Sequence, residues 1–303
     1  MPHPRHIALG LAALVALAGC ATRSADVAPA PVDPAQFRDW SCTRIHDETD
    51  LVQQRAADVA WTVDERAGQH YVALGLGLSV FWPALLAMRP DGAEAQALAG
   101  LKGRYEALQA AAASRDCPPR SDQLSPDRAA LMPVLPGERL AYEDRQGLRE
   151  PLSQRVMTIV ALRRDEIEFQ LSSHERSGTW RQDLAGNVTE APAGAIVWQR
   201  LLKRELDLGQ IVAGEMRIVD EPFVRARVRG QVVAVGPQKI AGRRFDAAVV
   251  ELFGDVQSGD ASTRLDGAIV IDRHSGVLLR LDLRSAQPRF QLQRRLVRVD
   301  AAS

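Results

Sequence analysis

The stretch FVRARVRGQVVAV, residues 223–235, alternates arginines with small or apolar residues, and GVLLRLDLR, residues 276–284, alternates in a similar way. A period of two is typical of antiparallel strands with one buried and one solvated face. Similar runs predict further strands at 156–162, 166–172, 178–184, 196–202, 211–218, 239–253, 262–272 and 289–299. Turn signals separate the strands, namely Ala185-Gly186-Asn187, Gly236-Pro237, Gly254-Asp255 and His274-Ser275-Gly276. A meander of roughly eight to eleven strands must curl to protect its edges, which predicts a curved antiparallel sheet or partial β-barrel over residues 137–303.

Two segments nearer the N-terminus carry apolar residues at helical spacing instead. The apolar seam in residues 47–66 consists of Val52, Ala56, Val59 and Val63, and the seam in residues 91–114 consists of Leu98, Leu101, Tyr105, Leu108 and Ala112. Each seam needs an apolar partner, so residues 39–118 are predicted to form an antiparallel helical hairpin. Residues 119–136 are Pro-rich and predict a linker, with one helical turn near Ala129. The predicted fold class is therefore α+β.

The N-terminus carries a targeting signal. Arg5 and His6 precede an apolar run that ends in Leu17-Ala18-Gly19-Cys20, and this run is typical of a secretory signal peptide, residues 1–19. The L-A-G-C ending resembles the lipobox of bacterial lipoproteins. That resemblance implies that Cys20 is acylated and anchors the mature chain in a membrane. Ala21 stands where an inner-membrane retention signal usually has Asp, so the resemblance implies the outer membrane, facing the periplasm. A plain signal peptide followed by a chance cysteine is the alternative. The Pro- and Ala-rich residues 20–38 predict a flexible tether.

Two further cysteines, Cys42 and Cys117, lie at the ends of the predicted hairpin. A secreted chain with two cysteines favours one disulfide, and folding the helices back on each other brings both cysteines to the same end. We therefore predict a disulfide between Cys42 and Cys117, with two free thiols as the alternative.

The apolar stretch YVALGLGLSVFWPALLAM, residues 71–88, contains no charged residue. It is not expected to span a membrane, because a span would place the two cysteines on opposite sides. Its glycines and Pro83 also weaken a continuous helix. It is predicted to join the two helices and to present an apolar patch. We expect this patch, which consists of Val80, Phe81, Trp82, Leu85 and Leu86, to contact lipid, the neighbouring domain or a second copy of the chain.

Two segments resemble known families. WSC at 40–42, LSVFWPALLA at 78–87, LKGRYEAL at 101–108 and Cys117 resemble small uncharacterised proteobacterial lipoproteins with a cysteine-bracketed helical hairpin. IAGRRFDAAVVEL at 240–252 and LDGAIVIDRHSGVLLRLDL at 265–283 are similar to the LolA/LolB-like half-barrel superfamily. The second resemblance implies a convex sheet around an apolar cavity that holds acyl chains.

The chain offers few candidates for chemistry. Acidic and basic residues balance at 38 each, which argues against nucleic-acid binding. The histidines have no ligand spacing, so no metal or cofactor is expected. Asp272, His274 and Ser275 fit a turn better than a catalytic triad, and Asp255, Asp260 and Asp266 fit a solvated hairpin loop. Trp180 and Trp198 are expected in the core of the sheet.

One strand face is basic. Arg225, Arg227 and Arg229 alternate along residues 223–235, and the last strand carries Arg289, Arg294, Arg295 and Arg298. If the two strands adjoin, these arginines would form a patch for anionic lipid headgroups. Pairing with acidic residues on neighbouring strands is the favoured alternative.

These observations together predict a non-catalytic outer-membrane lipoprotein that works by interaction or scaffolding in the envelope. The alternative is a carrier or sensor of acyl chains that uses the concave face of the β domain.

Overall fold

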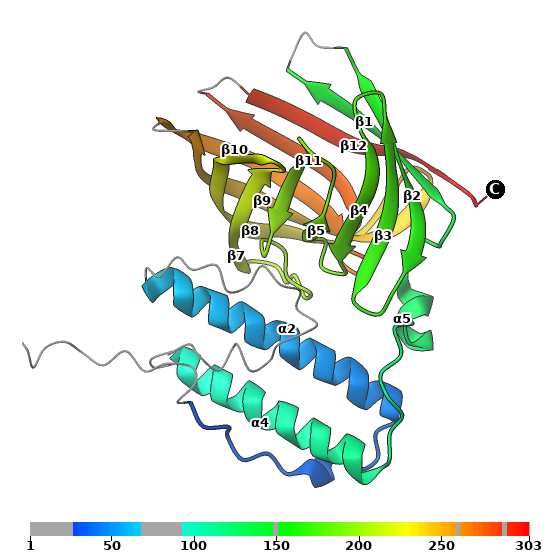
Figure 1. The fold of residues 1–303 in the computed structure, drawn as a ribbon, viewed down its shortest axis with the longest axis vertical. Helices are drawn as coiled ribbons and strands as arrows, with labels where there is room; N and C mark the ends of the chain where they lie inside the picture. The colour runs from blue at the N-terminus through cyan, green and yellow to red at the C-terminus, as the bar shows by residue number, and fades with distance from the viewer. Residues whose placement is uncertain (1–26, 68–92, 148–150, 259–260, 287–289, 303) are drawn as a thin grey trace, which may run out of the picture. The chain divides into compact units, whose positions relative to one another are not determined.

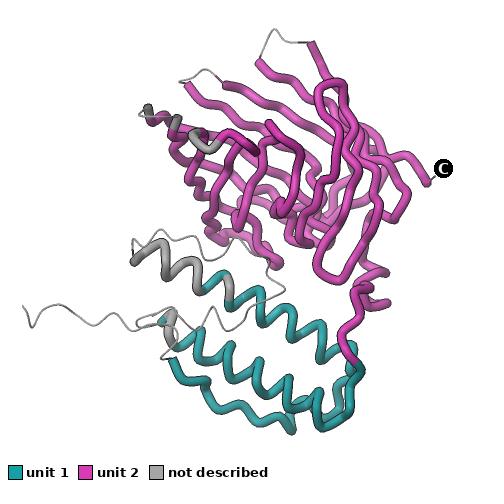
Figure 2. The backbone as a smooth tube through the Cα atoms, viewed as in Figure 1, with its two compact units in different colours: residues 1–118 teal, residues 119–303 magenta. Residues whose placement is uncertain are grey.

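The structure, a computed structural model, describes residues 27–67, 93–147, 151–258, 261–286 and 290–302. The chain divides into two compact units, residues 1–118 and residues 119–303 (Figure 2). The division follows the change from helical to alternating sequence pattern.

Unit 1 contains a 3-10 turn, η2 (Pro34–Phe37), and two long helices, α2 (Cys42–Ala67) and α4 (Ala93–Ser114). Part of each predicted seam lies in its core, where Val52 of α2 packs with Leu108 of α4 and with Ile45, which was not among the predicted seam residues. The side chain of Val63 lies outside the described part. Arg104 of α4 also binds Glu48 of α2 at 2.8 Å. The connection between the helices, residues 68–92, lies outside the described residues, so the hairpin turn stays a prediction.

Residues 27–40 pack along α4 instead of forming a free tether. The Ala30 N–H donates to the Ala99 carbonyl at 2.9 Å, and Lys102 Nζ donates to the Val27 carbonyl at 2.7 Å. Gly103 permits this approach, because a Cβ atom at that position would overlap with the Ala30 carbonyl oxygen. The prediction of a flexible tether is therefore wrong for residues 27–38, which are held by these hydrogen bonds to α4 and by the contact of η2 with that helix.

Unit 2 begins with α5 (Pro126–Leu131), near the predicted helical turn at Ala129, and continues as one antiparallel sheet. Its twelve described strands are β1 (Arg139–Gln146), β2 (Ser153–Leu162), β3 (Glu166–Ser173), β4 (Ser177–Asp183), β5 (Val188–Glu190), β6 (Ile196–Gln199), β7 (Ile211–Ile218), β8 (Glu221–Ile240), β9 (Arg243–Ser258), β10 (Ala261–Asp272), β11 (Leu278–Ser285) and β12 (Phe290–Asp300). The prediction missed β1 and β5. The α+β class fits broadly, with sheet dominating.

The sheet is a meander joined through its first and last strands. Its order is β5-β4-β3-β2-β1-β12-β11-β10-β9-β8-β7-β6, so β1 lies between β2 and β12 (Figure 1). The two edge strands, β5 and β6, are consecutive in the chain and lie near each other, which makes the sheet a nearly closed barrel. The turn before β5 also reaches the β6 segment, because Trp198 Nε1 donates to the Gly186 carbonyl at 2.7 Å. Asn187 and the Leu202 backbone exchange two hydrogen bonds of 2.8 Å.

Two of the predicted turns are wrong. Gly236-Pro237 lies inside β8, and the chain instead reverses at Ala241 and Gly242, whose φ values of 51° and 81° suit a tight hairpin turn. Gly254-Asp255 lies inside β9, so Asp255 belongs to a strand, as does Asp266 of β10. Asp260 lies outside the described residues.

Glycines in these strands serve close packing. A Cβ atom at Gly254 would overlap with the Arg227 carbonyl oxygen, and a Cβ atom at Gly267 would overlap with the Asp282 carbonyl oxygen. Strand glycines of this kind mark strong bends, which the curl of the sheet requires. The core lies inside the curl and includes Tyr142, Phe169, Trp180, Trp198 and Phe245.

Candidate functional site

Several predicted site residues lie outside the described part of the chain. They are Cys20 and the apolar patch residues Val80, Phe81, Trp82, Leu85 and Leu86. Among the described residues, no helix is long and apolar enough to cross a membrane. The same residues contain no cluster of histidine, cysteine and acidic side chains that could hold a metal ion.

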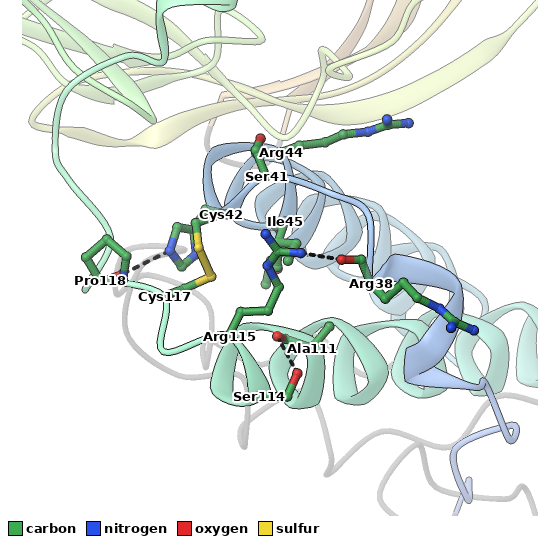
Figure 3. The surroundings of a disulfide bond; sticks show 12 residues. Arg38, Ser41, Cys42, Arg44, Ile45, Ala111, Ser114, Arg115, Cys117 and Pro118 are labelled. Carbon is green, nitrogen blue, oxygen red and sulfur yellow. Dashed lines mark hydrogen bonds between the residues drawn. A yellow bond between two sulfur atoms is a disulfide. The ribbon is translucent and has the colours of Figure 1, made fainter.

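The structure contains the predicted disulfide between Cys42 and Cys117, with Cα atoms 5.5 Å apart (Figure 3). Cys42 is the first residue of α2, so the helix begins five residues earlier than predicted. The surroundings also hold this end of the unit together, since the ring nitrogen Nε2 of His46 lies 3.0 Å from the Pro118 carbonyl oxygen. Arg115 donates to the Arg38 carbonyl, and Ser114 Oγ donates to the Ala111 carbonyl at 2.9 Å (Figure 3).

Arg225, Arg227 and Arg229 lie on the exposed face of β8, as the alternation predicts. Arg227 stands in register with Glu215 of β7 and Asp255 of β9. This register supplies the neighbouring acids that cross-strand pairing requires.

The two basic strands do not adjoin. Strands β9, β10 and β11 separate β8 from β12, so a patch shared by β8 and β12 is not formed. Along β12, Arg295 and Arg298 face outward beside Glu143 and Asp300, whereas Arg294 is buried. Arg289 lies outside the described residues.

The Asp272-to-Ser275 segment forms a turn with its own hydrogen bonds. The Asp272 carboxylate accepts from Ser275 Oγ and from the Ser275 N–H, both at 2.8 Å. Burial raises the pKa of Asp272, and these hydrogen bonds oppose the rise. His274 Nε2 lies 3.7 Å from a carboxylate oxygen of Asp246. Ser275 is fully buried, so its hydroxyl serves the turn and faces no described cleft.

A buried charged cluster inside the sheet is the most unusual arrangement in the described residues. Asp144 of β1 accepts two hydrogen bonds from Arg294 of β12, at 2.8 and 2.9 Å. Its carboxylate also lies 2.7 Å from a guanidinium nitrogen of Arg155 on β2. The exposed fractions of these residues are 2% for Asp144, 5% for Arg294 and 7% for Arg155. The backbone register brings them together, since Asp144 pairs directly with Arg294 and its neighbour Tyr142 pairs with Arg155.

The cluster contains more positive than negative charge. Two guanidinium groups surround one carboxylate, and Arg176, in the turn between β3 and β4, adds further positive potential at Arg155. Burial and the nearby Arg294 lower the pKa of Arg155 to about 10, so it stays charged at neutral pH. Burial also raises the pKa of Tyr142, whose hydroxyl donates to the Leu278 carbonyl at 2.9 Å. Tyr142 is therefore neutral and cannot balance the charge.

Beside this cluster lies a small cavity of about 10 Å³. Its polar lining comes from Tyr142, Gln182 and Arg294, and its apolar lining includes Met157, Trp180 and Trp198. The two tryptophans form the expected part of the core, with ring centroids 6.4 Å apart in an edge-to-face arrangement. No described residue accepts a hydrogen bond from Trp180 Nε1 or from Arg155 Nε.

Sequence reasoning missed this cluster for an identifiable reason. The sequence-based prediction assigns the arginines of the last strand to one basic patch, whereas Leu292, Arg294 and Leu296 alternate as one face at a period of two. An arginine flanked by leucines on the apolar face is the signal that could have located it. Its partner Asp144 lies on β1, which was not predicted as a strand.

Comparisons with known proteins give three structural likenesses at low similarity. A protein of Bacteroides fragilis with a YmcC-like fold is 11% identical, with a TM-score of 0.37 over 56% of this chain and 99% of that one. A Parabacteroides distasonis protein described as a lipoprotein is 9% identical, with a TM-score of 0.36 over 60% of this chain and 100% of that one. The hypothetical lipoprotein YmcC of Escherichia coli is 7% identical, with a TM-score of 0.31 over 54% of this chain and 85% of that one.

No protein-family model and no curated protein matches the sequence.

Proposed function

We propose that this chain is an exported lipoprotein, anchored by Cys20 in the outer membrane and facing the periplasm, that acts without catalysis by binding another envelope component. The observation that carries the proposal is the disulfide between Cys42 and Cys117, in a chain whose residues 1–19 are predicted to be a secretory signal peptide. Disulfides persist in oxidising compartments such as the bacterial periplasm and are rare in the cytosol.

The packing of unit 2 supports an interaction role over the carriage of acyl chains. A cavity for a ligand of that size has a volume of roughly 300 Å³ or more. Large buried side chains such as Trp198 and Phe169 occupy the interior of the curl, and the cavity beside Arg294 is only about 10 Å³. A carrier would have to rearrange this core before an acyl chain could enter.

The anchor is tested by metabolic labelling with palmitate in a Gram-negative host. The full chain is expected to take up label and to fractionate with the outer membrane, whereas Cys20→Ala is expected to lose both. Alkylation without reductant is expected to leave Cys42 and Cys117 unmodified. An unlabelled wild-type chain would contradict the anchor, and alkylation of both sulfurs would contradict the oxidised state.

The interaction role is tested at the apolar patch of residues 80–86. We propose that this patch contacts an envelope protein or a second copy of the chain. A photocrosslinking amino acid in place of Trp82 is expected to give a discrete adduct in intact cells. The matched control places the same group at Val160, which is 52% exposed on β2. An adduct pattern equal at the two positions would rule out the patch as a contact.

A further inference from the structure

The buried cluster of Asp144, Arg155 and Arg294 has a net positive charge in a place where charge is costly. Burying an ion costs several kcal/mol unless it is paired, so stable proteins balance such charges. Asp144 neutralises one of the two guanidinium groups. Arg176, in the turn between β3 and β4, is itself paired with Glu175 at 3.4 Å. One positive charge inside the sheet is therefore left without a described counter-charge.

Hydrogen-bond donors without a described acceptor lie in the cluster and in the wall of the cavity. Arg294 uses Nε and one terminal nitrogen for Asp144, which are two of the five N–H groups that a guanidinium carries. Arg155 Nε and Trp180 Nε1 are buried donors to which no described residue offers an acceptor. Trp180 is 3% exposed and lines the cavity together with Arg294. Buried polar groups in folded proteins almost always find a partner, so an acceptor is expected here.

The size of the cavity restricts that acceptor. A volume of about 10 Å³ is close to what one water molecule requires. A water molecule would satisfy the donors but would leave the charge unbalanced. A halide ion accepts from several N–H groups at once, carries the missing negative charge and is only slightly larger than water. The flexible side chain of Met157, which also lines the cavity, can yield the small additional space.

From the excess charge of the cluster, the unpaired donors and the cavity we propose that unit 2 binds one monovalent anion of halide size in the cavity, beside Arg294 and Trp180. The positive charge that it balances is that of Arg155, which is joined to Arg294 through Asp144. The anion completes the charge balance of the cluster and links Trp180 of β4 to Arg294 of β12 across the interior. This site is independent of the proposed envelope role, since it concerns how the sheet is held together.

Thermal unfolding of the full chain in sodium bromide and in sodium gluconate, at equal ionic strength, tests the site. Gluconate is far too large for the cavity. The melting temperature of the wild type is expected to rise with bromide concentration and to saturate, because a ligand that binds only the folded state stabilises it. Crystals grown in bromide are expected to show an anomalous peak within contact distance of Arg294 and Trp180.

Three variants make the test specific. Arg155→Met leaves the neutral pair of Asp144 and Arg294 and is expected to abolish the saturable response to bromide. Trp180→Phe keeps the ring but removes one donor, and about a tenfold higher bromide concentration is expected at half-saturation, the effect of one hydrogen bond to a charged group. Arg295→Met is the matched control, because Arg295 is the next residue on β12 but faces outward, 2.8 Å from Glu143, and it is expected to respond like the wild type.

Equal responses of the wild type and Arg155→Met to the two salts would overturn the proposal and leave a water molecule in the cavity. The absence of an anomalous peak beside Arg294 would overturn it as well. Should Arg155→Met fail to fold by circular dichroism, Trp180→Phe and the anomalous map still decide the question.

Discussion

Gly254 on β9 lies so close to Arg227 on β8 that a Cβ atom on the glycine would overlap with the carbonyl oxygen of the arginine. The two strands approach each other at this point because the sheet bends, and only a residue without a side chain permits the approach. The glycine is therefore a requirement of the curl and does not mark a turn, although a Gly-Asp pair in sequence suggests one.

Gly254→Ala is expected to destabilise unit 2 by about 1–3 kcal/mol, the usual cost of forcing extra atoms into a packed site. The matched control is Gly100→Ala on α4, where a Cβ atom would meet nothing within 4 Å. That change is expected to stabilise unit 1 by about 0.5–1 kcal/mol, since alanine favours a helix. Urea unfolding followed by circular dichroism measures both. Equal stability of Gly254→Ala and the wild type would refute the role of the glycine.

The disulfide is expected to dominate the stability of unit 1. It joins residues 75 positions apart, and closing a loop of this length stabilises a fold by about 4 kcal/mol in the chain-entropy model. The paired variant Cys42→Ser/Cys117→Ser is expected to lose roughly that amount and to match the reduced wild type. Denaturant unfolding with and without dithiothreitol measures the loss. Equal stability of the wild type with and without dithiothreitol would contradict this expectation.

The ion pair between Glu138 and Arg243 is expected to anchor the segment before β1 to the hairpin of β8 and β9. Arg243 donates to both carboxylate oxygens of Glu138, at 2.5 and 2.8 Å, and to the Pro133 carbonyl at 2.8 Å. Burial would raise the pKa of Glu138, but the bonds from Arg243 and from the Leu135 N–H outweigh burial and hold that pKa below its ordinary value.

Arg243→Met is expected to cost about 2 kcal/mol, because it leaves a buried carboxylate without its partner. Arg244→Met is the control, since Arg244 is the next residue and is exposed, and its effect is expected to stay within about 0.5 kcal/mol. The difference between the two variants is expected to shrink as the pH falls below 4.5, where Glu138 becomes protonated in the unfolded chain. A constant difference down to pH 3 would contradict the assignment, and denaturant unfolding at each pH measures it.

Asp183, at the end of β4, is expected to change the pH dependence of stability in the direction opposite to that of Glu138. Burial raises the pKa of Asp183 from 3.8 to about 6, although Asn187 and the N–H groups of the following turn donate to its carboxylate. Between pH 3.8 and about 6 the folded chain therefore keeps a proton on Asp183 that the unfolded chain has lost. The contribution of Asp183 to the free energy of unfolding is therefore greatest at low pH and declines as the pH rises from about 4 to 6. Asp183→Asn is expected to remove that decline, which is measured as the slope of unfolding free energy against pH. Parallel slopes for the two proteins would exclude Asp183 as its source.

Local alternation was enough to predict ten of the twelve strands, because each of these strands has a mostly apolar inner face. Strand β1 was not predicted because its inner face carries Tyr142 and Asp144, which make the sequence RLAYEDRQ look polar throughout. Strand β5 is only three residues long, too short for any period to be visible. The errors at Gly236 and Gly254 share one cause, since glycine marks both turns and bends and the local sequence does not distinguish them.

The candidate site depends on long-range register, which local sequence does not contain. Arg294 and Asp144 are 150 positions apart and meet only because β12 pairs with β1. The alternation of Leu292, Arg294 and Leu296 indicates that the arginine is buried but not which carboxylate it meets. The disulfide was predictable because, of the three cysteines, Cys20 is assigned to the lipobox and the remaining two allow one pairing.

The seam between β1 and β12 places the most C-terminal strand in the middle of the sheet, and both free edges fall in the middle of the sequence. Ribosomal synthesis therefore delivers the sheet as two halves, and β12, the last of the described strands to emerge, joins them. Loss of β12 would separate these halves, whereas loss of the last strand of an ordinary meander would merely shorten one edge. The integrity of the whole sheet thus depends on its most C-terminal described strand.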